Sequence, residues 1–404
     1  MNKGVNIAFH SLFAQNAFNP GQHRFGGAEK RTALLAKMVK ELGYSVGILM
    51  ADPGQGKRQR NLKDGIVPLY HAKYRLKEEG IEISKPVFES GLLSKIKDKV
   101  RRVLGKPPLN VSEKAKKEAF APFYKSKATL WVGLSLNDSM LELAQFCQES
   151  QTPFLLGLAG DVDLDFLSNS EGRDLFGASR EKKKKTMDLA AAVVVQNRFQ
   201  EKTLRQYFPS IPACFLPNPI DLSACPPYGQ KRSGAVWIGK MDSNKNPLAL
   251  LHLAQKIPQL KITMVSNPAD AGLGQDVLKS LPSNVKWIQS LSHPETLALM
   301  ALAEVHLSTS LQEGFPNTFL EAAAVKTPTV SLHVDPDNLM QQGLFGFCAG
   351  GNENLFVEKV LQAMDRNAEV MQMLETTWSY VQENHAYERV KERWGGIVQS
   401  VMQT

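Results

Sequence analysis

The sequence lacks long apolar runs and has few cysteines. No stretch approaches the roughly 18 consecutive apolar residues of a membrane-spanning helix, so we expect no such helix. The chain starts with a strand pattern and shows no apolar segment typical of a signal peptide, and we expect none. No paired metal-ligand spacing links the four cysteines, which are Cys147, Cys214, Cys225 and Cys348. We therefore expect free thiols in a reducing compartment.

The overall composition is typical of a globular protein. The chain has 404 residues, of which 43% are hydrophobic and 22% are charged. A chain of this length is long enough for two domains with cores of their own. The formal net charge of +8 predicts affinity for anionic ligands or surfaces, although it does not identify them. We expect no nucleic-acid partner.

One stretch near the C-terminal end carries the clearest functional pattern. Residues 305–310 are apolar and β-branched, which predicts a strand, and a loop with Gly314 and Pro316 follows. From Asn317 onward the composition becomes helical, with Asn317 as the expected N-cap. Another strand pattern begins near Pro328. In an α/β unit, such a loop lies at the carboxyl end of a sheet, where these folds bind ligands.

Two glutamates bracket this loop, with seven residues between them. Glu321 follows Asn317 by four residues, so both lie on one face of the predicted helix, near its free N–H groups. Those N–H groups favour an anion such as a diphosphate. Glu313 and Glu321 beside such a site would accept hydrogen bonds from the hydroxyls of a ribose or hexose. The alternative is an ordinary buried unit with two solvated glutamates.

The segment Glu313-Gly314-Phe315-Pro316 together with Glu321 resembles the E-x7-E signature of retaining glycosyltransferases of the GT-B fold, particularly family 4. The resemblance implies an α/β fold with two Rossmann-like, doubly wound domains that face a central cleft, and a C-terminal helix that crosses back to the first domain. It also implies a nucleotide-sugar donor held mainly by the C-terminal domain, and no obligatory metal, so we expect no metal-binding residue. The implied donor-binding residues of this stretch are Glu313, Gly314, Phe315, Pro316, Asn317, Thr318 and Glu321.

The N-terminal part begins with a βαβ pattern. Strand patterns at residues 6–11 and 45–50 flank a periodic helix that starts after Gly26 and Gly27. This glycine pair resembles the family's glycine loop, which approaches the donor phosphate and the acceptor. Glycine at a helix start lets a backbone N–H reach an anion without a Cβ in the way. A plain turn is the alternative.

Residues 52–127 depart from this alternation and carry many basic residues, which predicts an insertion with short elements. Within it, the apolar residues of 91–106 fall in an arc of roughly 120° on a helix, and six basic residues and one acid occupy the remainder. This basic amphipathic helix would either lie on an anionic membrane or cover the core of the N-terminal domain.

The segment from Gly160 to Asp165 contains three aspartates after a buried strand. A calcium loop does not fit, because Phe166 and Gly172 occupy its sixth and twelfth places. A metal-binding pair of Asp161 and Asp163 would belong to a different glycosyltransferase architecture. In family 4, a His or Asp that contacts the transferred sugar often lies here, and we favour this role for Asp161. Capping of the next helix is the alternative.

The domains are expected to meet near residues 216–221, where Leu-Pro-Asn-Pro-Ile-Asp resembles the family's PN-x-[IV]-D crossing. We predict an N-terminal acceptor-side domain at 1–218, a donor domain at 219–384 and a returning helix at 385–404. The family pattern Gly-Arg followed by Lys appears here with Lys240 in the arginine place and Lys245 retained. Both cations would neutralise the diphosphate, but Lys240 lacks the bidentate geometry of arginine.

Together these features predict a retaining glycosyltransferase that moves a hexose from a UDP- or GDP-linked donor to a hydroxyl of a glycan, glycolipid or other acceptor. Asp161, Lys245 and Glu313 are the expected catalytic residues, and no cofactor beyond the donor substrate is expected. Two alternatives share the architecture: a sugar-nucleotide epimerase and an inactive nucleotide-sugar-binding protein. We expect a cytoplasmic enzyme, peripheral on the inner face of the membrane if residues 91–106 bind lipid.

Overall fold

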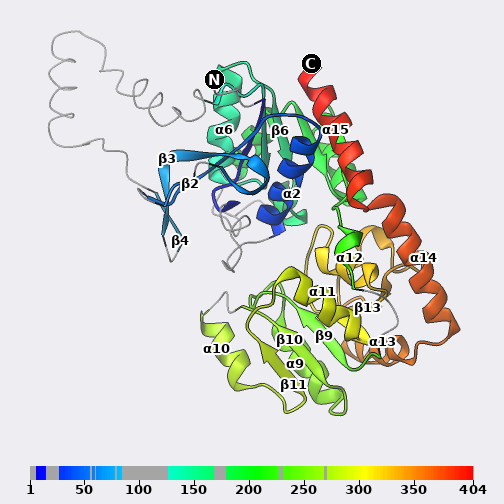
Figure 1. Ribbon diagram of the computed structural model, residues 1–404. Helices are drawn as coiled ribbons and strands as arrows, with labels where there is room; N and C mark the ends of the chain where they lie inside the picture. The colour runs from blue at the N-terminus through cyan, green and yellow to red at the C-terminus, as the bar shows by residue number, and fades with distance from the viewer. Residues whose placement is uncertain are drawn as a thin grey trace, which may run out of the picture.

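The computed structural model describes residues 6–14, 27–54, 57–59, 61–77, 80–83, 126–167, 179–226, 231–267 and 271–403. Gly26 and the helix predicted at 91–106 lie outside these ranges. The described elements form two α/β domains joined by the chain near residues 216–221 (Figure 1). Within these ranges, no helix has both the length and the apolar character needed to cross a bilayer.

The N-terminal domain contains a sheet in the order β4-β3-β2-β1-β5-β6-β7-β8, in which only the β3–β4 pair is antiparallel. Helices on both faces explain why its central strands are almost continuously apolar. Ile7 and Phe9 of β1 face one core cluster and Ala8 faces the other. The strands are β1 (Ile7–His10), β2 (Val46–Asp52), β3 (Val67–Lys77), β4 (Gly80–Ile83), β5 (Leu130–Leu134), β6 (Phe154–Gly157), β7 (Ala192–Val195) and β8 (Ala213–Phe215).

Helices and short 3₁₀ turns connect these strands. Those of the N-terminal domain are α2 (Gly27–Glu41), η1 (Lys63–Gly65), α6 (Asp138–Glu149), η2 (Asp161–Leu167), α7 (Arg180–Asp188) and α8 (Arg198–Tyr207). The segment predicted as a basic insertion contains β3 and β4, which extend the sheet at its edge. The order of the strands reverses between β1 and β5.

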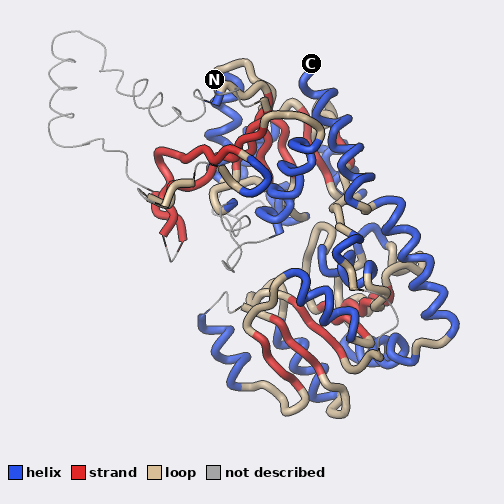
Figure 2. The backbone as a smooth tube through the Cα atoms, in the orientation of Figure 1, coloured by secondary structure: helices blue, strands red, loops and turns tan. Residues whose placement is uncertain are grey.

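The C-terminal domain contains an all-parallel sheet in the order β11-β10-β9-β12-β13-β14. Figure 2 draws its strands in red, in the lower half of the view. The order of connection reverses between β9 and β12, and in open α/β sheets the crevice at such a point binds ligands. The elements are η3 (Leu222–Ala224), β9 (Ala235–Ile238), α9 (Pro247–Lys256), β10 (Ile262–Val265), α10 (Ala271–Lys279), β11 (Val285–Ile288), α11 (His293–Leu302), β12 (Val305–Ser308), α12 (Asn317–Ala324), β13 (Thr329–Ser331), η4 (Pro336–Asn338), β14 (Gly346–Cys348) and α13 (Glu353–Asp365).

The last two helices, α14 (Ala368–Asn384) and α15 (Tyr387–Gln403), carry the chain back to the N-terminal domain, where α15 lies along α2 (Figure 1). Trp394 of α15 is fully buried, and its Nε1 donates to the Leu35 carbonyl oxygen at 3.1 Å. Ile220 exchanges backbone hydrogen bonds with His385 and Tyr387 at 2.8 and 3.0 Å. The two segments that connect the domains, one near Ile220 and one near His385, therefore run side by side. The predicted fold with its returning helix is confirmed.

One detail of the sequence prediction is wrong. Asn317 is the first residue of α12 and not its N-cap, because Pro316 occupies that place with φ −64° and ψ 123°. The proline ring already sets the extended backbone that an N-cap needs. The Asn317 side chain is then free to point elsewhere, and its Nδ2 lies 3.7 Å from where a Cβ on Gly27 would be.

The packing of α15 on α2 yields a stability prediction. Trp394→Ala leaves a large cavity in the N-terminal core and should lower the free energy of unfolding by about 3–5 kcal/mol. Urea unfolding measures this loss, and Gln399→Ala on the exposed side of the same helix serves as the control. A loss below about 1 kcal/mol would show that the cluster around Trp394 does not hold α15 in place.

Candidate active site

The loops that follow β9 and β12 are bound to each other at the point where the strand order reverses. Trp237 Nε1 donates to the Thr309 hydroxyl at 2.9 Å, and this hydroxyl donates to the Lys245 carbonyl oxygen at 2.7 Å. Asn244 Nδ2 donates to the Gln312 carbonyl oxygen at 3.0 Å. These bonds fix the backbone that carries Lys245.

Lys245 and Glu313 form an ion pair within this pair of loops, and both side chains are partly buried. The Lys245 backbone N–H also donates to Asp242 Oδ1 at 2.9 Å. The structure thus brings together two of the predicted catalytic residues. Lys240 lies at the start of the loop that follows β9, where it is exposed, and it makes no ion pair with any residue that the structure describes.

Two helix N-termini, one from each domain, meet beside these loops. Asn317 and Thr318 open α12, so their backbone N–H groups have no acceptor within the helix. Gly27 opens α2, and a Cβ there would lie 3.7 Å from Asn317 Nδ2. Both helix dipoles present their positive ends to this region. Free N–H groups and positive dipole ends suit an anion. Anion binding at Gly27 and at the start of α12 stays a prediction.

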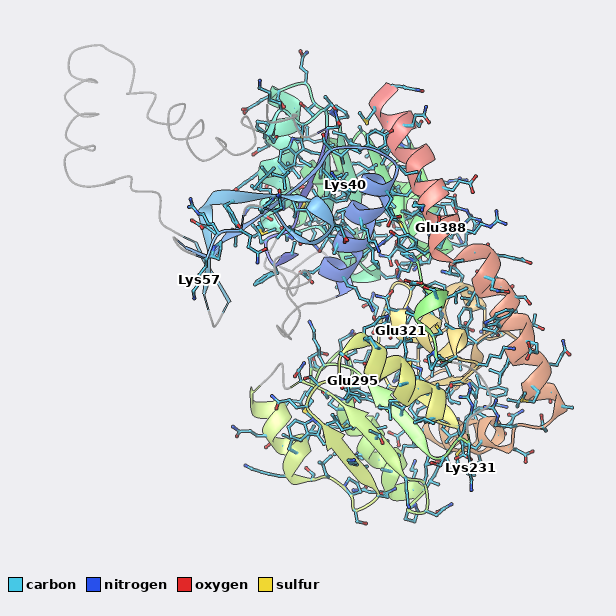
Figure 3. The ribbon with its side chains drawn as sticks, in the orientation of Figure 1. Lys40, Lys57, Lys231, Glu295, Glu321 and Glu388 are labelled. Atoms are coloured by element: carbon cyan, nitrogen blue, oxygen red, sulfur yellow. The ribbon has the colours of Figure 1, made fainter. Side chains whose placement is uncertain are left out.

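Glu321 lies at the junction between the two domains (Figure 3). Its side chain is 9% exposed, and its Oε1 accepts from Lys30 Nζ of α2 at 2.8 Å. His293 Nδ1, at the start of α11, lies 3.4 Å from both Glu321 Oε1 and Lys30 Nζ. Burial and, to a smaller extent, the Lys30 charge lower the pKa of His293 below its ordinary value. His293 is therefore neutral at physiological pH.

Asp161 lies opposite the β12 loop, at the first position of η2. Its Oδ1 accepts from Asn197 Nδ2 at 2.9 Å and from Gln200 Nε2 at 2.8 Å. Burial raises the pKa of Asp161 to about 6, and the Asp337 and Asp165 carboxylates add to this effect, although the two hydrogen bonds oppose it. A perturbed carboxyl in a cleft is typical of a functional site.

Asp163 has a structural role instead. It is fully buried, and its carboxylate accepts from the Ser135 hydroxyl at 3.1 Å and from the Leu136 and Ala159 N–H groups at 3.0 and 2.7 Å. Because its oxygens hold the backbone, Asp163 does not share a ligand site with Asp161. Across the described part of the chain, no group of three or more His, Cys, Asp or Glu side chains is arranged to hold a metal ion.

Several solved structures share this two-domain fold. The sucrose-phosphate synthase from Thermosynechococcus elongatus aligns with a TM-score of 0.76 at 16% identity, over 99% of each chain. HepE of Anabaena, in complex with UDP and glucose, aligns with a TM-score of 0.69 at 13% identity, over 98% of this chain and all of the other. The pneumococcal O-GlcNAc transferase GtfA, in complex with UDP and GlcNAc, aligns with a TM-score of 0.64 at 12% identity, over 100% of each chain.

The C-terminal domain also matches a sequence family. Residues 232–366, which contain Lys240, Lys245, Glu313 and Glu321, match the family model described as Glycosyl transferases group 1. The chain is a glycosyltransferase with the GT-B fold. Comparison with curated proteins gave no significant match.

The sequence pattern did not reveal which residues of the glycosyltransferase join its two domains. Asn197 caps α8, since its Oδ1 accepts from the Gln200 N–H at 2.8 Å, and its Nδ2 also donates to the Gly314 carbonyl oxygen at 3.0 Å. Asp337 of the C-terminal domain accepts from the Arg198 N–H at 2.7 Å. An Asn before a predicted helix signals a cap, but nothing in the local sequence indicates the contacts across the cleft.

The raised pKa of Asp161 yields a pH prediction. Folded Asp161 binds its proton more tightly than the unfolded chain, whose pKa is near 3.8, so stability falls as the pH rises from about 4 to about 6. At about 1.4 kcal/mol per pKa unit, the ionised carboxylate costs up to about 3 kcal/mol above this window. Asp161→Asn keeps an acceptor oxygen for Asn197 and Gln200 without the charge.

The Asp161→Asn glycosyltransferase should therefore have a higher melting temperature than the wild type at pH 8, with little difference at pH 4. Thermal unfolding at both pH values measures this, and Asp188→Asn at the exposed end of α7 is the control. An equal effect of Asp161→Asn at the two pH values would show that the charge of Asp161 does not carry the cost.

Proposed function

We propose that this glycosyltransferase retains the anomeric configuration and moves a hexose from a UDP- or GDP-linked donor to an acceptor hydroxyl, in the manner of family 4. One observation carries the proposal. Lys245, Glu313, the N-terminal amides of α12 and Glu321 converge at the carboxyl ends of β9 and β12. Cations and amides suit a diphosphate, while the two carboxylates suit hydroxyl groups.

Each group has a role in the transfer. Negative charge develops on the leaving diphosphate, and Lys240, Lys245 and the N–H groups of Asn317 and Thr318 would stabilise it. Glu321 would accept from the ribose hydroxyls. Glu313 would hold the transferred sugar, with the backbone N–H groups of Gly314 and Phe315 beside it. The complexes of HepE with UDP and glucose, and of GtfA with UDP and GlcNAc, support a nucleotide-sugar donor.

Asp161 would contact the transferred sugar from the N-terminal side. Asn197 and Gln200 both bind its Oδ1, and Gly314 lies so near that a Cβ there would be 3.1 Å from Gly160 Cα. The proposed reaction uses no covalent nucleophile. The acceptor hydroxyl attacks from the face of the departing phosphate, which takes the hydroxyl proton as the bond between the sugar and phosphate oxygen breaks.

Lys245→Ala tests the leaving-group assignment. Loss of this cation should lower kcat/KM by about 100-fold or more, because charge on the diphosphate grows in the transition state. Transfer from UDP- and GDP-sugars to acceptor extracts measures the rate, with Lys286→Ala at an exposed position of β11 as the control. A folded variant with an unchanged rate would remove Lys245 from the mechanism. Incubation with nucleotide sugars in the absence of an acceptor separates transfer from epimerisation, because an epimerase would still convert the donor to its epimer.

We further propose that transfer needs no divalent metal, because Lys240 and Lys245 together supply the charge with which Mg²⁺ clamps a diphosphate in other transferases. EDTA should leave kcat/KM unchanged within about twofold, measured in the presence of the best donor. Full loss of transfer activity in EDTA and its recovery with Mn²⁺ would contradict this proposal. Asp161 would then have to be considered again as a metal ligand.

The proposed acceptor is a hydroxyl of a glycan or of a lipid-linked glycan. A lipid-linked acceptor requires the cleft to face a bilayer, and residues 91–106 are the segment whose pattern fits this task. That segment lies outside the described residues, so binding to an anionic inner membrane surface stays a prediction. The six basic residues of the segment, at about 1 kcal/mol each, would support reversible association of a cytoplasmic enzyme.

A further inference from the structure

Lys30 links the N-terminal domain to the carboxylate that is proposed to bind the ribose. It lies one turn into α2, and its Nζ crosses to Glu321 Oε1 of α12 at 2.8 Å. The lysine side chain is 33% exposed, whereas Glu321 is 9% exposed. The ammonium therefore lies on the solvent-exposed side of a nearly buried carboxylate. His293 Nδ1 lies 3.4 Å from this ammonium.

The same ammonium lies close to the proposed diphosphate site. Glu321 and Asn317 are four residues apart on one face of α12, which corresponds to about 6 Å along the helix axis. The N-terminus of α2 faces Asn317 as well, because a Cβ on Gly27 would lie 3.7 Å from Asn317 Nδ2. The flexible four-carbon stem of Lys30 can move its charge from Glu321 toward Asn317 without a backbone change.

Donor binding supplies a reason for this movement. Ribose hydroxyls are neutral donors that can replace the ammonium on Glu321, so the buried carboxylate keeps its hydrogen bonds. A diphosphate carries more negative charge than one carboxylate and accepts from an ammonium at several oxygens. The ion pair is thus exchanged for two better-matched contacts, ribose on Glu321 and phosphate on Lys30.

We propose that Lys30 is a third cation for the donor diphosphate, supplied by the N-terminal domain across the cleft. This inference rests on the proposed function, since it needs a nucleotide-sugar donor bound along α12. Lys240 and Lys245 both belong to the C-terminal domain, so Lys30 makes full neutralisation of the leaving group depend on contact between the domains. Lys30 thereby couples donor binding to domain closure.

Calorimetry with UDP and GDP tests the inference. Lys30→Met should weaken binding of the preferred diphosphate about 10-fold, as loss of a charge-assisted hydrogen bond does. Lys30→Arg should stay within about threefold of the wild type, because it keeps a cation of similar reach. Lys37→Met, on the same helix and 3.8 Å from Glu41, is the matched control and should bind like the wild type.

The Glu321→Gln background separates the proposed contact from a purely structural ion pair. If Lys30 binds phosphate, Lys30→Met should weaken diphosphate binding about 10-fold in this background too. If the effect disappears there, or if Lys30→Met binds diphosphate as tightly as the wild type, Lys30 acts only through Glu321 and the inference is overturned. Failure of the wild type to bind UDP, GDP or their sugars would instead overturn the proposed function.

Discussion

The hydrogen bond from Asn197 Nδ2 to the Gly314 carbonyl oxygen joins the two domains at the centre of the site. Asn197 Nδ2 also donates to Asp161, so one amide group fixes the loop that carries Glu313 against the carboxyl proposed to face the sugar. The contact leaves little space for a side chain at position 314, where a Cβ would lie 3.1 Å from Gly160 Cα and 3.2 Å from Gln200 Nε2. The absence of a Cβ in glycine thus favours the close approach between the domains.

Elsewhere in the site, the charged side chains are arranged in pairs of opposite sign. Glu313 and Glu321 each pair with a lysine, Lys245 from the same domain and Lys30 from the other. Glu313 precedes α12 and Glu321 lies within its second turn, and each of these carboxylates is balanced by one ammonium group. In the proposed reaction, an entering diphosphate would replace the carboxylates as the partner of the ammonium groups, and the carboxylates would accept from sugar hydroxyls. The same residues can therefore serve domain contact and donor binding in turn.

Much of the architecture was predictable because it depends on local patterns. The apolar strands, the helices that follow them and the Glu313-to-Glu321 spacing all lie within short segments, and the structure confirms a doubly wound fold with a returning helix. The N-cap assigned to Asn317 was wrong by one residue, because a helix boundary depends on backbone angles that Pro316 sets. The fold thus followed from residues near one another in the chain.

The partners of the site residues depended on tertiary structure. The order of strands and loops in the sequence was enough to predict that Glu313, Lys245 and the start of α12 lie together at one edge of a sheet. Only the packing of the two domains decided that Lys30 meets Glu321, and that Asn197 meets Gly314. These pairs are separated by more than a hundred residues, and no local periodicity encodes a contact between two separately folded sheets. The raised pKa of Asp161 has the same origin in part, because burial is its main cause and the Asp337 carboxylate of the C-terminal domain adds to it.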